Sequence, residues 1–372
     1  MCLLLCALAA CKPGYPYQPP AQTGDGWPTA SRRDAGMDEA LLQEMMDRLD
    51  GETDQDVHGI AIVKDGRLVF EMYLEGYAWS YDPAREYKGQ RVTHDADTLH
   101  NLASVTKAVT SALIGIAIDR GLIASVDAPL AGFFPEYAHL FDEQKARITL
   151  RHLLTMSSGL EWNEGQYGYG DSRNDLIRLF REPDPIAYIL SRPAIHEPGT
   201  TYYYSGGDVN LLGEVIKKVS GQRMDAFADE YLFAPLGITR YQWDFINADV
   251  VHASGNLQLR PRDVAKFGYL YLNGGVWQGR QVISKEWIQE STQGHIDIPG
   301  GEAGDQYGYQ WHLKTYRVGT EPIHAFCKEG WGGQRVTVFP DLALVVVFTG
   351  GSYVGRDPVD ELTTRYILPA VR

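Results

Sequence analysis

The chain has 372 residues, of which 44% are hydrophobic and 22% charged, and its formal net charge at pH 7 is −14. A chain of this length can bury a large core and is long enough for more than one domain or sub-domain. The excess of negative charge, with no block of basic residues, removes the usual electrostatic basis of nucleic-acid binding. We therefore expect a globular protein whose partners do not include nucleic acids.

The first residues of the chain are apolar and end in Leu-Ala-Ala ahead of Cys11. Small residues before a cysteine, behind an apolar run, resemble a bacterial lipoprotein signal over 1–10, with Cys11 as the lipidated first residue of the mature chain. The usual basic start is missing, so either translation begins a few residues upstream or the run is not a signal; we favour the first. The run is too short to span a bilayer. The expected location is the bacterial cell envelope, with a lipid as the only link to the membrane.

Residues 11–36 are rich in Pro, Gly and Gln, which predicts an extended tether rather than packed structure. Removal of 1–10 would leave Cys11 and Cys327. With a lipid on Cys11, Cys327 has no partner, so we expect no disulfide framework.

After the tether, hydrophobic periodicity and turn signals define the first elements. Helical spacing is found over 37–49. The β-rich runs 59–63 and 67–73 flank Asp65-Gly66, the strongest short signal for a hairpin. Residues 75–98 are polar and are predicted to form a loop.

The next stretch, 100–119, has apolar residues at helical spacing and predicts a buried amphipathic helix that ends at Gly121. The same reasoning applied to the remaining sequence predicts helices over 148–154, 175–180, 185–190, 209–219 and 224–231, a helix starting at 260, strands over 307–313, 324–328, 334–339 and 342–348, and a terminal helix over 357–368 that stops before Pro369.

Strands thus lie toward both ends of the chain and helices in the middle. The simplest packing is an α/β (α+β) fold in which one mostly antiparallel sheet, built from both ends, is flanked by helices and carries a helical insertion. We place the domain at 37–372, with its sheet part over 37–120 and 266–372 and the insertion at about 121–265.

The predicted helix at 100–119 begins with the only Ser-x-x-Lys sequence of the chain, Ser104 to Lys107. A hydroxyl and an amine one turn apart, at the positive end of a helix, can act as nucleophile and base. A serine near a helix start and a lysine on a solvated flank are also common without chemistry, so the match needs support from elsewhere in the chain.

Two further segments supply that support. Tyr204 lies on a loop before a predicted helix and could relay the proton of Ser104, although a core aromatic residue would give the same pattern. Gly332 and Gly333 precede the strand that opens at Gln334, where amides free of side-chain bulk could donate to an oxyanion. Two adjacent glycines would equally suit a tight turn.

A Gly- and aromatic-rich loop over 161–171 contains Trp162, Tyr167 and Tyr169. Loops of this composition often cover binding sites, although a surface Ω-loop is the simpler alternative.

With these motifs in order, the chain resembles the serine β-lactamase and penicillin-recognising family over about 37–368, above all its class C-like esterase and 6-aminohexanoate-dimer hydrolase branch. The resemblance implies the fold above and an acyl-enzyme mechanism without cofactor or metal. It implies that Ser104 is the acylated nucleophile, Lys107 the base and Tyr204 a second proton-transfer group. The backbone amides of Ser104 and Gln334 would form the oxyanion hole.

Two departures from the family pattern bear on the substrate. Gly206 stands where the family has an Asn that touches substrate, and Trp331-Gly332-Gly333 replaces Lys-Thr-Gly. The lost lysine is the cation that meets the carboxylate of β-lactams and peptides; Lys328 is near in sequence and could partly compensate.

A pocket walled by Trp331 and the aromatic loop would favour short-chain carboxylic esters or uncharged linear amides. D-Ala-D-Ala carboxypeptidase or β-lactamase activity is the alternative within the family. A catalytically silent binding or sensor protein of the same fold is the alternative of another class.

Two other hydrolase classes lack their motifs here. No serine has the Gly-x-Ser-x-Gly frame of an α/β-hydrolase. The ten histidines contain no His-Glu-x-x-His pattern, so we expect no catalytic zinc.

Overall fold

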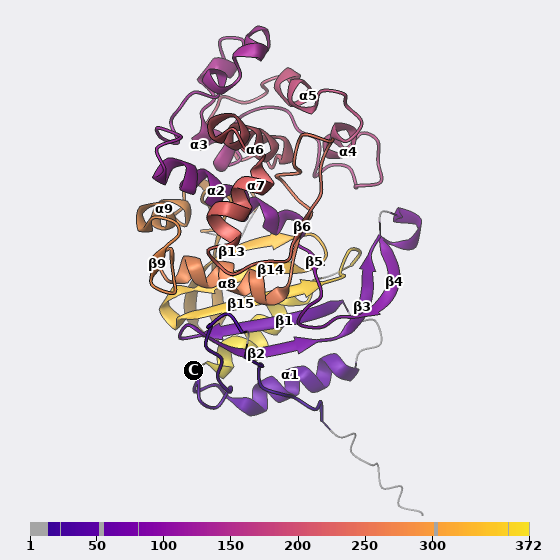
Figure 1. Cartoon of the computed structure of the whole chain (residues 1–372). Coiled ribbons are helices and arrows are strands. Elements are labelled where there is room, and N and C mark those ends of the chain that lie inside the picture. Colours follow the sequence, from indigo (N-terminus) through magenta and orange to yellow (C-terminus); the bar gives the residue numbers. More distant parts are fainter. Residues whose placement is uncertain are drawn as a thin grey trace, which may run out of the picture.

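The computed structural model describes residues 14–22, 24–51, 56–80, 82–300, 304–355 and 357–371. Within these residues, eight antiparallel strands form one sheet in the order β10-β11-β12-β13-β14-β15-β1-β2 (Figure 1). The strands are β1 Val57–Lys64, β2 Arg67–Tyr73, β10 Ile296–Asp297, β11 Gln306–Tyr307, β12 His312–Val318, β13 Glu321–Gly330, β14 Gln334–Phe339 and β15 Leu344–Gly350. Because β1 pairs with β15, the sheet joins the two ends of the chain, as predicted.

The hairpin β1–β2 forms where Asp65-Gly66 predicts it. Both turn residues have positive φ, 50° and 75°, which suits the right-handed twist of a hairpin. Successive residues of β1 face opposite sides of the sheet, so that Ile60 and Ala61 belong to two different hydrophobic cores. The sheet is therefore covered on both faces.

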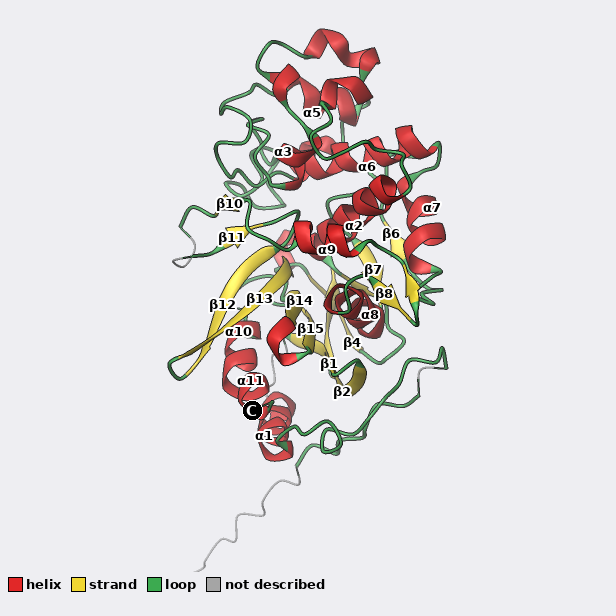
Figure 2. Ribbon diagram, turned by 90° about the vertical axis from the view of Figure 1, so that its left-hand side faces the viewer, coloured by secondary structure: helices red, strands yellow, loops and turns green. Residues whose placement is uncertain are grey.

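Helices cover the two faces (Figure 2). On one face, α8 (Pro261–Leu272) packs on β1, β14 and β15, with α2 (Thr106–Asp119) beyond it. On the other lie α1 (Glu39–Gly51), α10 (Val359–Leu362) and α11 (Leu368–Ala370). The last of these helices contains Pro369, so the prediction that the terminal helix stops before this residue is wrong.

Helix α2 is buried on every side, because the residues from Thr106 to Ala117 are all buried. The prediction of a buried helix is confirmed over 106–119, whereas His100–Asn101 form a short strand and Ala103–Val105 a 3₁₀ turn. A helix without a solvated face is not amphipathic. It ends as predicted, with Gly121 at φ 71°.

The helical part lies above the sheet in Figure 1. Its helices are α3 Leu150–Leu154, α4 Asp175–Leu179, α5 Pro185–Ser191, α6 Gly206–Ser220 and α7 Met224–Ala228, and α9 Lys285–Ser291 follows later in the chain. Short strands form smaller sheets: β3 Glu75–Trp79 with β4 Lys88–Thr93, β5 His100–Asn101 with β7 Leu257–Leu259 and β6 Gln242–Trp243, and β8 Val276–Trp277 with β9 Arg280–Gln281.

Three local predictions are wrong. The stretch 75–98 contains the β3–β4 hairpin. The stretch 307–313 contains a turn between β11 and β12 rather than one strand. Part of the predicted tether is packed on the domain: Trp27 is 2% exposed and donates to the carbonyl of Gly66, and Thr29 bridges to Leu68. Cys11 and the whole of the predicted signal over 1–10 lie outside the described residues, as do residues 12 and 13.

Two further facts concern the predicted link to the membrane and the predicted lack of a disulfide framework. No helix in the described ranges has the length and apolar character needed to cross a membrane. Cys327 is a free, buried thiol, and burial raises its pKa to about 12.

Candidate active site

Ser104 lies in a tight turn that leads into α2. The 3₁₀ turn Ala103–Val105 follows β5, and Ala103 has φ 44°, a left-handed conformation that costs a non-glycine residue about 1–3 kcal/mol. The turn is held from both sides, since the amide of Ala103 donates to Asn101 Oδ1 and Thr106 Oγ1 donates to the carbonyl of Ala103. Such strain persists only where the surroundings impose it. The strained turn places the hydroxyl of Ser104 at the N-terminal end of α2.

Two predicted partners reach the hydroxyl of Ser104. Lys107 Nζ lies 2.9 Å from Ser104 Oγ, and Tyr204 OH lies 2.6 Å from the same oxygen. Tyr204 comes from the loop before α6, 100 residues along the chain, and Lys107 Nζ lies 5.0 Å from the centre of its ring. The structure thus brings the three predicted catalytic residues together at one oxygen.

The protonation of this trio follows from its burial. Burial lowers the pKa of Lys107 to about 8, while the Glu164 carboxylate acts in the opposite direction. Burial, and then the charge of Glu164, raises the pKa of Tyr204 above its usual range, so this phenol stays protonated. Lys107 is therefore the group of the trio that can accept a proton near neutral pH.

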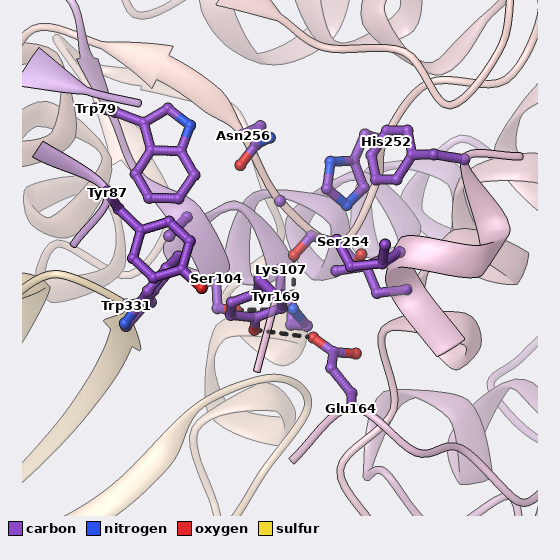
Figure 3. Close-up of a pocket in the computed structure, with 15 residues that line it drawn as sticks. Trp79, Tyr87, Ser104, Lys107, Glu164, Tyr169, His252, Ser254, Asn256 and Trp331 are labelled. Carbon is purple, nitrogen blue, oxygen red and sulfur yellow. Dashed lines mark hydrogen bonds between the residues drawn. The ribbon is translucent and has the colours of Figure 1, made fainter. Parts of the chain in front are cut away.

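The ammonium end of Lys107 is positioned by a second segment. Nζ donates to the carbonyl of Ser254 over 2.6 Å. Asn210, on α6, clamps that residue with two hydrogen bonds, from its Nδ2 to Ser254 Oγ and from the Ser254 amide to its Oδ1. Because the Ser254 carbonyl is fixed, its hydrogen bond holds Lys107 Nζ in place, and this nitrogen can also bond to Ser104 Oγ (Figure 3).

Glu164, which the sequence analysis does not single out, is a buried carboxylate at 4% exposure. It accepts hydrogen bonds from Trp162 Nε1 at 2.8 Å, from the amide of Gly206 at 2.9 Å and from Tyr169 OH at 3.2 Å. A Cβ on Gly206 would lie 2.6 Å from Glu164 Oε2. The carboxylate therefore stands next to the position from which the family's Asn side chain would project.

The end of β13 packs closely against the Ser104 turn. A Cβ at Gly330 would lie 2.4 Å from the carbonyl oxygen of Leu102 and 3.1 Å from the amide nitrogen of Ser104, so only glycine fits there. Gln334, which opens β14, pairs with Gly330, and its side chain is fixed by two hydrogen bonds to the backbone of Gly350. This close approach brings the predicted oxyanion donors, the amides of Ser104 and Gln334, into one neighbourhood.

The turn between these strands requires its two glycines. Gly332 and Gly333 have φ of 92° and 82°, and a Cβ on Gly332 would overlap the Tyr353 ring at 2.4 Å. The turn presents Trp331, whose Nε1 donates to the carbonyl of Tyr353.

Trp331 is the centre of an aromatic wall. Its ring lies within 4.6–5.4 Å, centre to centre, of four others, from Trp79, Tyr87, Tyr169 and Tyr353. Figure 3 shows Trp79, Tyr87 and Trp331 on one side of Ser104 and Glu164 on the other. Sequence reasoning missed Trp79 and Tyr87, because they lie in the stretch predicted to be a loop.

The cavity above Ser104 has a volume of about 70 Å³ and a largely apolar lining. Trp79, Tyr87, Tyr169 and Trp331 of the aromatic wall line it together with Lys107 and Glu164, and the remaining lining residues are Ala103, Leu176, Ile177, Phe180, His252, Ser254, Gly255 and Asn256. Burial and the nearby Lys107 lower the pKa of His252 to about 3, so this ring is neutral. A second hollow that also contains Ser104 is lined by Gly332 and Gly333 together with Glu329 and Arg335.

Several predicted substrate contacts are placed elsewhere. Trp162 and Gly206 do not line this cavity; both hold Glu164 from behind. Tyr167 packs under the guanidinium of Arg173. Lys328 is fully buried and donates to Tyr307 OH, and burial, then Lys107, lowers its pKa well below its usual range. It is not the cation that would compensate for Trp331.

The antiparallel sheet is covered by helices, and beside it the serine of a Ser-x-x-Lys sequence is hydrogen-bonded to a tyrosine. This combination is typical of the penicillin-recognising class of folds. The chain belongs to the β-lactamase family: the family model described as Beta-lactamase matches residues 39–365. The prediction of the family from its motifs is confirmed.

Among curated proteins, the chain is 30% identical to esterase EstB of Burkholderia gladioli over 59% of this chain and 53% of the relative. It is 25% identical to 6-aminohexanoate-dimer hydrolase of Paenarthrobacter ureafaciens over 53% of this chain and 52% of the relative. The chain thus spans about half the length of the curated relatives it matches.

Solved structures share the fold. A family VIII carboxylesterase matches with a TM-score of 0.66 at 20% identity, over 91% of this chain and 95% of that chain. A class C β-lactamase from Rhodobacter sphaeroides matches with a TM-score of 0.64 at 17% identity, over 91% and 100%. The predicted fold class is confirmed.

Proposed function

We propose that this protein is a serine hydrolase that forms an acyl-enzyme at Ser104 and acts on short-chain carboxylic esters or uncharged linear amides. The observation that carries the proposal is the position of Ser104 Oγ, which lies within hydrogen-bond distance of both Lys107 Nζ and Tyr204 OH. Nucleophile, base and second proton-transfer group are thus in contact before any substrate binds.

In the proposed reaction, neutral Lys107 accepts the proton of Ser104 as Oγ attacks the substrate carbonyl. The amides of Ser104 and Gln334 stabilise the resulting oxyanion. Tyr204 donates its proton to the departing alcohol or amine and regains one from Lys107. Water then attacks the acyl carbon, the same groups carry the protons in reverse, and Ser104 is released.

The substrate preference follows from the charges and shapes around the cavity. The wall formed by Trp331, Trp79 and Tyr87 offers apolar surface where related enzymes have a lysine, which favours uncharged acyl groups. The carboxylate of Glu164 also faces this cavity and repels an anionic substrate. Both features disfavour β-lactams and peptides that carry a carboxylate.

The test is an activity screen of the purified protein against p-nitrophenyl esters, nitrocefin and linear amide oligomers. We expect ester or amide turnover that Ser104→Ala abolishes and Lys107→Ala reduces by several orders of magnitude, because the groups act as a unit. A fluorophosphonate probe should label the wild type at Ser104. Labelling that persists in Ser104→Ala would refute the assignment, and a higher kcat/KM for nitrocefin than for the acetate or butyrate ester would favour a β-lactamase. Absence of turnover and labelling would support a silent binding protein.

We further propose that residues 37–372 act as one hydrolase domain, with the helical insertion at about 121–265, at the bacterial cell envelope. A lipid on Cys11 would hold the protein at the membrane, and stable anchoring requires more than one acyl chain. Expressed with a complete signal, the wild type should fractionate with membranes and Cys11→Ser should not. Equal partitioning of the two proteins would end the lipoprotein proposal.

A further inference from the structure

We propose that His58, His94 and His100 form a buried metal site, with Zn²⁺ as the best-matched ion. The three residues come from β1, from the segment after β4 and from β5. Each offers one ring nitrogen, and these three atoms lie within 4.8 Å of one another. Imidazole nitrogens are preferred ligands of Zn²⁺, and three histidines with one further ligand form a known type of zinc site.

The rings have more nitrogens than hydrogen-bond partners. Within the described ranges, His58 Nε2 and both ring nitrogens of His94 are buried and make no hydrogen bond. His58 and His94 are 0% and 8% exposed, so water does not readily take the missing place. An unsatisfied buried polar atom destabilises the folded state, and a coordinated ion would offset that cost at His94.

The backbone makes room for this cluster. A Cβ on Gly76 would lie 2.2 Å from the ring of His58, and one on Gly351 would lie 2.8 Å from it. Strand β3 and the segment directly after β15 therefore admit the imidazole only because both positions are glycine.

The orientation of His100 is that of a ligand. Its Nδ1 lies 3.1 Å from the carbonyl oxygen of Asn101, which makes Nδ1 the donor and directs the lone pair of Nε2 toward His58. Metal-bound histidines generally donate their second nitrogen to a carbonyl or carboxylate in this way.

The distance between His100 Nε2 and His58 Nδ1 is 2.8 Å, which suits a hydrogen bond between neutral rings. A tetrahedral ion about 2.0–2.1 Å from each nitrogen needs them about 3.3 Å apart. Ion binding thus separates the two rings by about half an ångström, and the proton of His58 moves from Nδ1 to Nε2, so that Nδ1 presents its lone pair to the ion. His94 stacks on His58 with ring centres 4.3 Å apart, and a modest rotation directs one of its unpaired nitrogens to the same point.

The site's electrostatics suit neutral ligands. Burial, then the neighbouring histidines, lowers the pKa of His58 to about 2 and of His100 to about 4, and burial lowers that of His94. At neutral pH all three rings are uncharged, so a divalent ion meets no positive charge on its ligands.

The ion would be structural and would act next to the active site. Ser104 follows His100 by four residues, and His94 follows the hairpin that carries Trp79 and Tyr87. A bound ion would tie the nucleophile turn and the aromatic wall to β1. The proposal does not depend on the proposed hydrolase activity.

The test uses full-length protein without a polyhistidine tag, stripped with EDTA and then dialysed against ZnCl₂ and afterwards against metal-free buffer. We expect about one Zn²⁺ per chain by mass spectrometry of the metal, the stoichiometry of a single three-histidine site. Zinc should also raise the Tm by a few degrees, because the ion binds only the folded state. Ser104→Ala should bind zinc like the wild type, which separates this proposal from that of the function.

The informative variant is His94→Phe, which keeps a ring stacked on His58 but removes a ligand. It should lose the bound zinc and the zinc-dependent rise in Tm, and without zinc it should be at least as stable as the wild type. The matched control is His295→Phe, since His295 also stacks on a ring, that of Tyr309 at 4.3 Å, outside the cluster. This control should bind zinc normally.

If His94→Phe fails to fold, His100→Gln and the zinc dependence of the wild-type Tm provide the same comparison. Substoichiometric zinc in the wild type, or zinc retained in both ligand variants, would show that the cluster is a hydrogen-bonded stack of neutral rings and would overturn the proposal.

Discussion

The carboxylate of Glu164 occupies the space beside Gly206: its Oε2 accepts a 2.9 Å hydrogen bond from the Gly206 amide and would lie 2.6 Å from a Cβ at that position. Glu164, which belongs to the loop over 161–171, thus lies where related enzymes have the side chain of an Asn at the position of Gly206. The exchange replaces a neutral amide with a charge. It thereby links the loop over 161–171 to the electrostatics of Lys107.

The first prediction concerns that charge. The proposed mechanism requires neutral Lys107, so kcat/KM should rise with pH through the lysine pKa of about 8. Glu164 raises this pKa, so Glu164→Gln should lower it and move the rising limb of the profile to lower pH. The glutamine can keep the hydrogen bonds, since its carbonyl accepts from Trp162 and Gly206 while its amide faces Tyr169. The pH–rate profile of a p-nitrophenyl ester measures the shift.

The control for this experiment is Glu161→Gln. Glu161 lies on the same loop but pairs with Arg192 at the surface. Its pH profile should match that of the wild type. A Glu164→Gln profile with an unchanged limb would mean that Glu164 does not influence the catalytic base.

The second prediction tests the exchange between positions 164 and 206. Gly206→Asn alone should lower kcat, because the new side chain collides with Glu164 and displaces it. Adding Glu164→Ala should recover part of the loss, since the asparagine then has space. Contacting residues commonly show coupling of about 0.5–3 kcal/mol in a double-mutant cycle. Additive effects in kcat/KM would argue against a shared site.

The third prediction concerns Tyr204. Its phenol stays protonated and lies 2.6 Å from Ser104 Oγ, so it should act by passing a proton. Tyr204→Phe should reduce kcat by about 10²–10⁴-fold, the usual effect of positioned proton transfer. Steady-state kinetics on an ester measure the loss, and circular dichroism checks the fold. A substrate with a good leaving group should suffer less than one with a poor leaving group; equal losses would contradict the role of proton donor.

The fourth prediction concerns substrate selection by Trp331. A cation facing a substrate carboxylate contributes about 1.5–3 kcal/mol as a charge-assisted hydrogen bond. Trp331→Lys should therefore raise the ratio of nitrocefin to ester turnover by about tenfold for each 1.4 kcal/mol recovered. Trp331→Met removes the ring without adding a charge and serves as the control. Equal ratios in the two variants would show that the lost ring, and not the gained charge, alters selection.

Local interactions determined what the sequence alone could reveal. A serine and a lysine three residues apart meet because one helical turn brings them together, and Asp65-Gly66 forms a hairpin because its backbone conformations match the twist of strands. The strands at both ends and the helices between them could likewise be predicted, because the hydrophobic periodicity of each helix or strand is contained in its own short segment. The family's motif order then placed Tyr204 beside Ser104.

Only the tertiary structure decided how distant segments complete the site. Glu164 meets Gly206 across 42 residues, and no spacing rule connects them. The polar stretch 75–98 forms a hairpin because Trp79 and Tyr87 pack on Trp331, and residues near Trp27 are held by the edge of the sheet. The three clustered histidines belong to segments that are separate in sequence and meet only in the folded chain. Periodicity reports burial of one segment, whereas these contacts depend on which segments the whole core brings together.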